Sequence, residues 1–345
     1  MSTKKASRSK EPVASSRGFD RELAELESLA EAVRAAPAPA AEQIEALRKA
    51  LGHRNNFLVA KAAKLATDLE IAALLPDVLA AYERFFVDAV KTDPQCWAKN
   101  ALSKALVKLG HRGKDAYLRG LGHIQLEPVW GGSSDTAGAL RGTCTHALVD
   151  CPGLSDAEIL TALLDPMTDT DKTVREEAAR AIGQVGGIAG SLLLRLRAKL
   201  AKDEPEVEVM GAVYSSLLGV EGAAAIPLVA AAMKDGEDLG AEAAYALAEM
   251  RTPAALAALR ARLAEGADSW FGGVLLSAIA LTRLGEGLDF LIALIARDGR
   301  QAAEAIEALG RLAPNAELRA RMEQAVEQAG SPRLRQAMGQ HLGNS

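Results

Sequence analysis

The stretch "TDTDKTVREEAARAIGQVG", residues 168–186, decides the fold of this chain. It opens with acidic, turn-forming residues and ends at two glycines. Between them, apolar residues fall at helical spacing: Val174, Ala178, Ala181, Ile182 and Val185. Apolar residues three and four positions apart predict an amphipathic helix with one side in a core.

This pattern is repeated along the chain. Positions equivalent to Val174 recur at intervals of 28 to 42 residues: Leu58, Ala98, Leu140, Met210, Leu239, Gly273, Gln301 and Leu334. Another amphipathic segment precedes each copy. Repetition of this kind is typical of stacked helix pairs, because a single pair cannot bury its apolar face alone. The sequence therefore predicts an all-α fold, an α-α superhelix of about eight helix pairs.

The composition is that of a helical protein, and together with the cysteine count and the apolar runs it indicates the cellular compartment. Of 345 residues, 49% are hydrophobic, 25% charged and 4% aromatic, with a net charge of −5. This charge does not favour a nucleic-acid partner. Cys96, Cys144 and Cys151 are too few for a disulfide scaffold. With no secretory signal and no apolar run of membrane-spanning length, we expect a cytoplasmic protein without a membrane partner.

Two regions follow from the pattern. Residues 1–40 begin basic and polar and continue rich in Ala and Pro, so they predict a disordered tail. An alternative is a basic arm that touches an acidic surface. Residues 41–345 form the predicted solenoid.

An acidic residue and a basic residue recur six positions apart in three consecutive copies. The acid falls in the turn before the second helix, where a carboxylate caps free N–H groups. Stacking would bring the acid of one copy near the base of another. We interpret these pairs as a structural ladder, with an ion-binding or catalytic role as the alternative: Asp93 and Lys99, Asp135 and Arg141, Asp169 and Arg175.

At these residues the chain resembles a known family. "DTDKTVREEAARAIGQVG" is similar to a HEAT repeat of the bacterial type related to phycobilisome lyase subunits. Residues 93–110 and 135–151 match it fairly, whereas the copies from Met210 to Leu309 lose the Asp and the Arg. The resemblance implies a HEAT-like solenoid. It implies little about function, because scaffolds, lyases and hydroxylases share this repeat.

The sequence offers no catalytic or metal-binding motif. Cys144, His146 and Cys151 lack the spacing of a zinc site. HEAT-type hydroxylases, which resemble this fold, bind iron through His-Glu dipeptides, but no histidine here precedes a glutamate. Hydrolase and nucleotide-binding signatures are missing as well. We therefore expect no catalytic residue, metal or cofactor.

The segment 127–142, "EPVWGGSSDTAGALRG", is longer than the equivalent loops of other copies. An insertion in a solenoid maps to one rim, which is often a binding rim. Trp130 is therefore either an exposed anchor for a partner or a plug between repeats.

Exposed positions of the second helices should line the concave face. In the first copies these positions are mostly basic, and they predict a binding stripe: Lys61, Lys64, Lys104, Lys108, His146 and Arg180. The alternative is an ordinary solvated face. HEAT-like DNA glycosylases add aromatics and a catalytic carboxylate to such a groove, and aromatics are sparse on the predicted stripe.

The first functional hypothesis is a non-enzymatic scaffold that binds a protein partner along the concave face. A partner that contacts the lysines there would be acidic. The alternatives are a lyase-like or hydroxylase-like enzyme on the same solenoid and a nucleic-acid-binding HEAT-like protein.

Overall fold

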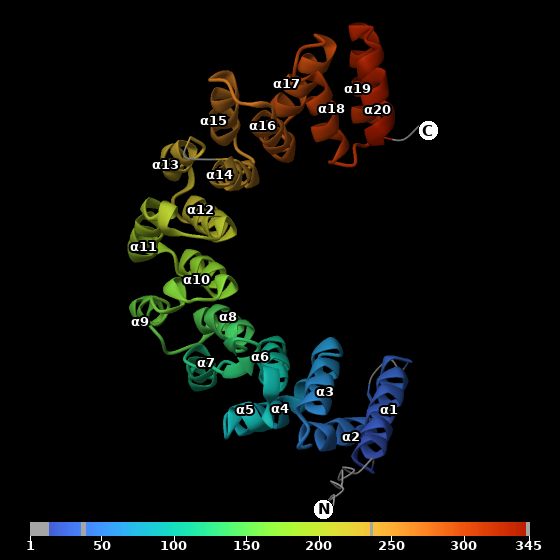
Figure 1. Ribbon diagram of the computed structural model, residues 1–345, viewed down its shortest axis with the longest axis vertical. Coiled ribbons are helices and arrows are strands. Elements are labelled where there is room, and N and C mark those ends of the chain that lie inside the picture. Colours follow the sequence, from blue (N-terminus) through green and yellow to red (C-terminus); the bar gives the residue numbers. More distant parts are fainter. Residues whose placement is uncertain (1–13, 36–38, 235–236, 343–345) are drawn as a thin grey trace, which may run out of the picture. The chain divides into compact units, whose positions relative to one another are not determined.

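The computed structural model describes residues 14–35, 39–234 and 237–342. The protein is an all-α, HEAT-like solenoid with one added β-hairpin (Figure 1). Its chain divides into two compact units, Met1–Leu154 and Ser155–Ser345. The sequence pattern indicated a single domain from residue 41, because the repeat continues without a break across this boundary.

Unit 1 consists of the first helices, the hairpin and the helix after it. Their bounds are α1 (Ala14–Ala35), α2 (Ala41–Leu51), α3 (Asn56–Asp68), η1 (Ala72–Leu74), α4 (Leu75–Arg84), α5 (Ala89–Thr92), η2 (Pro94–Cys96), α6 (Trp97–Lys108), α7 (Lys114–Leu121), β1 (Leu126–Val129), β2 (Gly132–Asp135), α8 (Gly138–Ala147) and η3 (Leu148–Asp150).

Unit 2 contains the remaining elements. They are α9 (Asp156–Ala162), η4 (Pro166–Thr168), α10 (Lys172–Val185), α11 (Gly187–Lys199), η5 (Ala201–Asp203), α12 (Val207–Glu221), η6 (Gly222–Ala225), α13 (Ile226–Ala232), α14 (Glu237–Glu249), α15 (Pro253–Ala264), α16 (Ser269–Leu281), α17 (Gly285–Ala296), α18 (Ala302–Gly310), α19 (Ala316–Ala329) and α20 (Pro332–Leu342).

Second helices of successive repeats pack against one another within each unit. In unit 1, α3 contacts α6, and α6 contacts α8. In unit 2, α10, α12, α14, α16, α18 and α20 pack in succession, and each from α12 on also contacts a first helix (Figure 1). Alanine at the contact positions allows the close approach, and it is buried at each of them: Ala105, Ala147, Ala243, Ala246, Ala280, Ala305 and Ala308.

The N-terminal region differs from the disordered tail expected over residues 1–40. Residues 14–35 form α1, which packs on α2 and α3. Leu26, Ala30 and Val33 fall at helical spacing and are buried in that contact. These apolar residues provide the burial that the polar start of the chain lacks. Residues 1–13, the most basic part of the predicted tail, lie outside the described residues.

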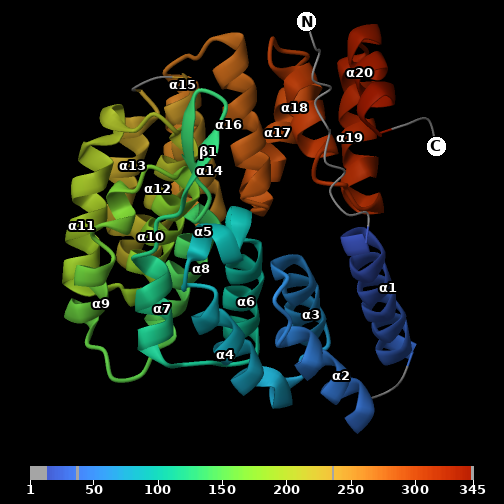
Figure 2. The same cartoon turned by 60° about the horizontal axis from the view of Figure 1, so that its bottom comes forward.

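The predicted rim loop is a β-hairpin at its start. Strands β1 and β2 pair antiparallel, with Leu126 opposite Asp135 and Val129 opposite Gly132. Gly131 adopts a φ of 86° in the connection, which a residue without a Cβ reaches at no steric cost. The hairpin projects from the helices of unit 1 (Figure 2).

One run is apolar and long enough to cross a membrane by length and composition, Val207–Ala232. This differs from the sequence expectation, in which no run had that length. The run comprises α12 and α13, which are separated by a turn at Gly222 with a φ of 60°. Because α12 packs on α10, α11 and α14, its apolar composition is that of a core helix.

Candidate functional site

A groove of about 450 Å³ lies between the second helices α3 and α6 of unit 1. Helix α3 contributes Phe57, Lys61 and Lys64 to its walls. Helix α6 contributes an aromatic, an amide and an amine: Trp97, Asn100 and Lys104. Its volume falls in the range of small-molecule and cofactor sites, which is roughly 300–1,000 Å³.

Helical periodicity explains why these side chains share one groove. Trp97, Asn100 and Lys104 are spaced three and four residues apart, so they lie above one another on a single face of α6. The same spacing aligns the side chains of α3. Ala60 and Ala101 also line the groove, and their small side chains leave the space between the two helices open.

Aromatic rings form a row at one end of the groove. The ring centroids of Phe57 and Trp97 lie 5.5 Å apart, and those of Phe19 on α1 and Phe57 lie 6.0 Å apart. Trp97 is 46% exposed, so part of its indole faces solvent. The sequence indicated few aromatics on this stripe because Phe57 and Trp97 precede the positions counted there, close to the start of their helices.

The lysines of the groove differ in their partners. Lys61 and Lys104 form no ion pair with any described residue, and the Lys61 ammonium lies 5.5 Å from the Phe57 ring centroid. Lys64 pairs with Asp68 at 3.2 Å. Lys108, one turn beyond Lys104, pairs with Glu70 at 2.7 Å. Two lysines without an ion-pair partner among the described residues, in the same groove as an exposed aromatic ring, make the groove suited to an anion that carries a planar group.

Asn100 carries an unsatisfied acceptor. Its Oδ1 is shielded from solvent and has no hydrogen-bond partner among the described residues, although the residue lines the groove. A buried acceptor without a donor costs about 1–3 kcal/mol. Because this oxygen is shielded from the solvent that fills the groove, it is not itself a contact point for a ligand there.

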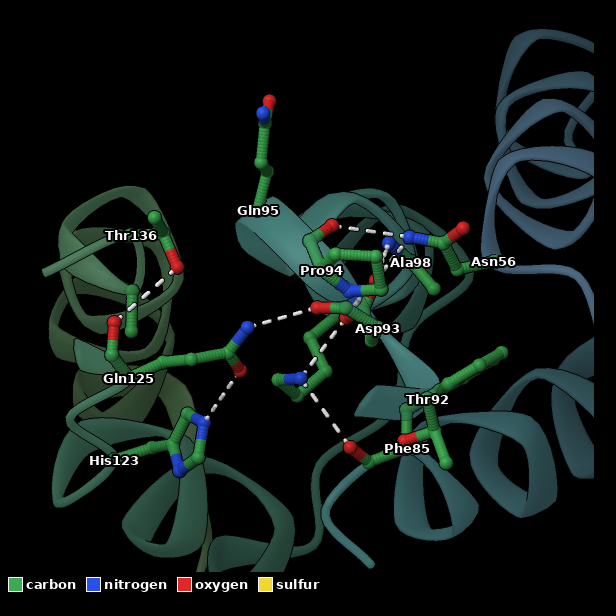
Figure 3. A network of polar contacts seen from close by, with 12 residues as sticks. Asn56, Phe85, Thr92, Asp93, Pro94, Gln95, Ala98, His123, Gln125 and Thr136 are labelled. Atoms are coloured by element: carbon green, nitrogen blue, oxygen red, sulfur yellow. Dashed lines mark hydrogen bonds and ion pairs between the residues drawn. The ribbon is translucent and has the colours of Figure 1, made fainter. Parts of the chain in front are cut away.

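A buried polar network fixes the start of α6, where Trp97 lies. The Asp93 carboxylate accepts hydrogen bonds from the backbone N–H groups of Ala98 and Lys99, at 2.8 and 3.0 Å. It also pairs with the Lys99 ammonium at 2.9 Å, and both side chains are fully buried. Asn56 donates to the same carboxylate, and Gln125 donates to the Asp93 carbonyl (Figure 3).

The turn before Trp97 is strained and is held by the hairpin. Gln95 and Cys96 have φ angles of 60° and 56°, which are uncommon for residues other than glycine. The Glu127 carboxylate, on β1, accepts a hydrogen bond from the Gln95 N–H. Desolvation acts to raise the pKa of Glu127, but hydrogen bonds from Gln125, Thr136 and the Gln95 N–H together lower it. The position of Trp97 thus depends on a contact made 30 residues later in the chain.

The other predicted ladder residues also lie in polar contacts. Arg141 pairs with Asp135 at 2.6 Å within one copy, as Lys99 does with Asp93, whereas the ladder was expected to join the acid of one copy to the base of another. Arg175 donates to the carbonyl of Asp169, while its guanidinium pairs with Glu204 at 2.6 Å. Glu204 was not predicted, because it is a glutamate and lies six residues before the Val174-equivalent Met210, whereas Asp169 lies five residues before Val174.

The remaining predicted site residues lie apart from the groove. His146 is exposed on α8. Arg180 belongs to unit 2, where it pairs with Glu176 and Glu177. Trp130 is fully exposed at the tip of the hairpin and is therefore not a plug between repeats.

The described residues include no group of three or more His, Cys, Asp or Glu side chains placed to hold a metal ion. Cys96, Cys144 and Cys151 are buried, and burial raises the pKa of the Cys144 thiol to about 12. A thiol held protonated in this way is a poor metal ligand and a poor nucleophile. The Tyr82 hydroxyl lies 3.6 Å from the sulfur of Cys144.

No family model matches the chain, and no curated protein does. Among solved structures, the chain is similar to human deoxyhypusine hydroxylase in complex with glycerol. The match has 16% sequence identity and a TM-score of 0.28, and it covers 77% of this chain and 98% of that one.

The hypothesis of a non-enzymatic scaffold is not borne out by this finding, since the matched protein is by its printed name an enzyme. Stacked helix pairs serve enzymes and scaffolds alike, so the repeat pattern could not decide between them. At this identity and TM-score, the likeness assigns neither a substrate nor a mechanism to the present chain.

Proposed function

We propose that the groove between α3 and α6 binds a single strand of nucleic acid. The observation that carries the proposal is the exposed indole of Trp97 beside two lysines, Lys61 and Lys104, that have no ion-pair partner among the described residues. Proteins that bind single strands combine aromatic stacking platforms with cations that follow the phosphates.

The arrangement of charge supports a strand over a single nucleotide. Trp97 and Lys104, which both line the groove, are seven residues apart on α6, which corresponds to about 10 Å along the helix. Stacked nucleotides in one strand repeat every ~3.4 Å, so several of them cover this distance and one does not. The net charge of the whole chain, −5, does not oppose local binding, because the lining of the groove contains three lysines and one aspartate.

Salt dependence and charge reversal test the proposal. A fluorescein-labelled eight-nucleotide strand is titrated with the protein, and anisotropy reports binding. With three phosphate contacts, the slope of log K against log salt should be about −2. The double substitution Lys61→Glu and Lys104→Glu should weaken binding at least tenfold and flatten this slope.

The matched control carries the same change of charge elsewhere. Lys49 on α2 and Lys199 on α11 are exposed lysines of first helices, and their reversal to Glu should leave the affinity unchanged. Equal binding by the groove variant and the control variant would refute the proposal. Free mononucleotide that competes as well as the strand would show that one nucleotide fills the site.

We also propose that the repeats are of the bacterial type related to phycobilisome lyase subunits. The support is the sequence of residues 168–186, which form the turn before α10, α10 itself and its C-terminal glycine. The hydroxylase activity in the name of the matched structure is not carried over to this chain, because 16% identity and a TM-score of 0.28 do not support a transfer of activity. Assay of the purified protein for bound iron by mass spectrometry tests this point.

A further inference from the structure

Helix α11 of unit 2 carries a row of exposed apolar side chains. They recur every fourth residue, and their exposed fractions fall from 84% at the first to 45% at the last: Ile188, Leu192, Leu196 and Leu200. The buried residues of the helix, Gly190, Leu194 and Ala198, have the same spacing and lie on the opposite side. Single exposed leucines need no explanation, whereas a continuous row of them marks an interaction site.

The row stays exposed although α11 packs on α9, α10, α12 and η5 (Figure 1). Apolar residues therefore occupy both the inner and the outer side of α11, a distribution that is typical of a helix buried all round. Other first helices of unit 2 present charge to solvent instead, such as Asp156 on α9 and Glu286 on α17. The outer side of α11 thus has the composition of a surface that is covered.

We propose that a second copy of this chain covers the row, with the two α11 helices packed antiparallel across a two-fold axis. The row is symmetric about Leu194. An antiparallel arrangement therefore places Leu192 opposite Leu196 of the second copy, and Ile188 opposite Leu200 of the second copy. Each apolar side chain meets another, as a two-fold dimer requires, because the same patch serves both partners.

The arginines of α11 favour a second copy over a lipid surface. Arg195 pairs with Glu221, and Arg197 pairs with Glu204, so carboxylates of the same chain already neutralise both guanidinium groups. A helix that lies on a membrane uses such cations to attract anionic headgroups. The net charge of unit 2, −8, also opposes an anionic surface.

The one charged residue within the row is compatible with the antiparallel arrangement. Lys199 follows Leu192 by seven residues, so it lies on the same side of α11. In the proposed register it lies opposite Ala189 of the second copy, which is uncharged and exposed in the single chain. The dimer therefore places no two like charges opposite each other, and the aliphatic part of Lys199 adds apolar contact.

The size of the row predicts a weak dimer. Leu200 lies twelve residues after Ile188, which corresponds to about 18 Å along the helix. One helix face of this length buries less than the ~800 Å² per partner of a standard interface. We therefore expect monomer and dimer to exchange at roughly micromolar concentration.

Sedimentation velocity of the full chain at ~1 to 100 μM tests the dimer. The wild type should shift from monomer to dimer as its concentration rises. The double substitution Leu192→Glu and Leu196→Glu should raise the dissociation constant at least ~100-fold, because a two-fold interface contains each buried charge twice. The matched control is Leu281→Glu, which changes an exposed leucine of α16 in the same unit and should leave the dissociation constant unchanged.

Cysteine crosslinking tests the antiparallel register. Leu192→Cys chains are mixed with Leu196→Cys chains and oxidised, and the native cysteines, which are buried, should not react. The mixture should give more disulfide-linked dimer than either variant alone, because the proposed register places these two positions opposite each other. Equal yields in all three samples would overturn the register.

Two further results would overturn the dimer itself. One is a chain that stays monomeric over the whole concentration range, or a dimer that the two leucine substitutions leave intact. The other is flotation of monomeric protein with phosphatidylserine vesicles that the same substitutions abolish, because the row would then face lipid. An unchanged melting temperature shows that each variant is folded. None of these results depends on the proposed function, since the groove belongs to unit 1 and the row to unit 2.

Discussion

The two units share one kind of core and differ in the charge of their surfaces. Residues 1–154 contain 21 Lys and Arg against 18 Asp and Glu, a net charge of +3. Residues 155–345 contain 19 against 27, a net charge of −8. Both units stack second helices through small buried residues, such as Ala62 in α3 and Ala178 in α10.

The contrast extends to the second helices themselves. Those of unit 1 present lysines, whereas those of unit 2 present carboxylates, including Glu176 on α10, Glu208 on α12 and Glu242 on α14. Partial burial raises the pKa of Glu242, and the neighbouring carboxylates raise it further. The difference teaches that buried positions specify the repeat, while exposed positions of the same helices vary in chemistry without altering the fold.

The largest expected effect tests whether the core is common to both units. Ala62→Arg and Ala178→Arg each force a long charged side chain into a fully buried contact. Each should cost more than about 5 kcal/mol and abolish folding of its unit. Circular dichroism during urea unfolding measures the loss. A variant that melts like the wild type would show that its unit does not share this packing.

A second comparison concerns the buried ion pairs. Lys99→Met in unit 1 removes the cation that pairs with fully buried Asp93, at a cost of about 3–5 kcal/mol. Arg175→Met in unit 2 should cost less, about 1–3 kcal/mol, because Glu204 retains its pair with Arg197. Urea midpoints rank the two variants, and the opposite order would contradict the assigned partners.

A third comparison uses two tryptophans of similar exposure. Trp97 in unit 1 is 46% exposed and Trp270 in unit 2 is 48% exposed. Trp97→Ala should weaken binding of the nucleic-acid strand by about 1–3 kcal/mol, the contribution of one stacked base. Trp270→Ala should leave the affinity unchanged. Equal losses in both variants would place binding outside the groove.

The smallest effect is the pH dependence caused by Glu242 in unit 2. The folded state raises its pKa, so its favourable contribution is present below the unfolded pKa and is lost as pH rises through the folded pKa. Glu242→Gln should therefore stabilise the protein at pH 7, by less than about 1 kcal/mol because the side chain stays partly solvated. The gain should vanish below about pH 4.

The control for this variant is Glu286→Gln on α17, which changes an exposed carboxylate. Chemical unfolding at several pH values measures both. A stabilisation of Glu242→Gln that persists at low pH would show that charge repulsion is not its cause.

Much of the fold was readable from the sequence, since it depends on periodicity. Leu58, Ala98, Leu140, Val174 and Met210 were predicted as equivalent apolar positions, and all are buried. In the later copies, the residue equivalent to Val174 was predicted less accurately. Gly273 and Gln301 are half-buried and lie one residue away from the buried Gly272 and Ala302. The Arg of the earlier copies is missing here, although Asp268 still caps the start of α16 by accepting a hydrogen bond from the Phe271 N–H.

The candidate site was predictable only in part. Lys61, Lys64 and Lys104 were placed on one surface because their spacing alone gives the face of each helix. The aromatic row was missed, since Phe57 and Trp97 come from helices whose lateral packing the sequence does not specify. Glu127 was likewise not connected with Gln95, because the hairpin contact joins distant segments.

By itself, the sequence determined that the chain folds into stacked helix pairs and that lysines lie on exposed faces of the early second helices. Both follow from the 3.6-residue period, which is a local property of the chain. The tertiary structure alone decided that Trp97, Lys61 and Lys104 line one groove and that, within the described part of the chain, the two lysines lack an ion-pair partner and the Asn100 acceptor lacks a donor. Whether a polar atom is paired depends on what packs beside it, and neighbours in space are set by contacts between repeats that sequence spacing does not encode.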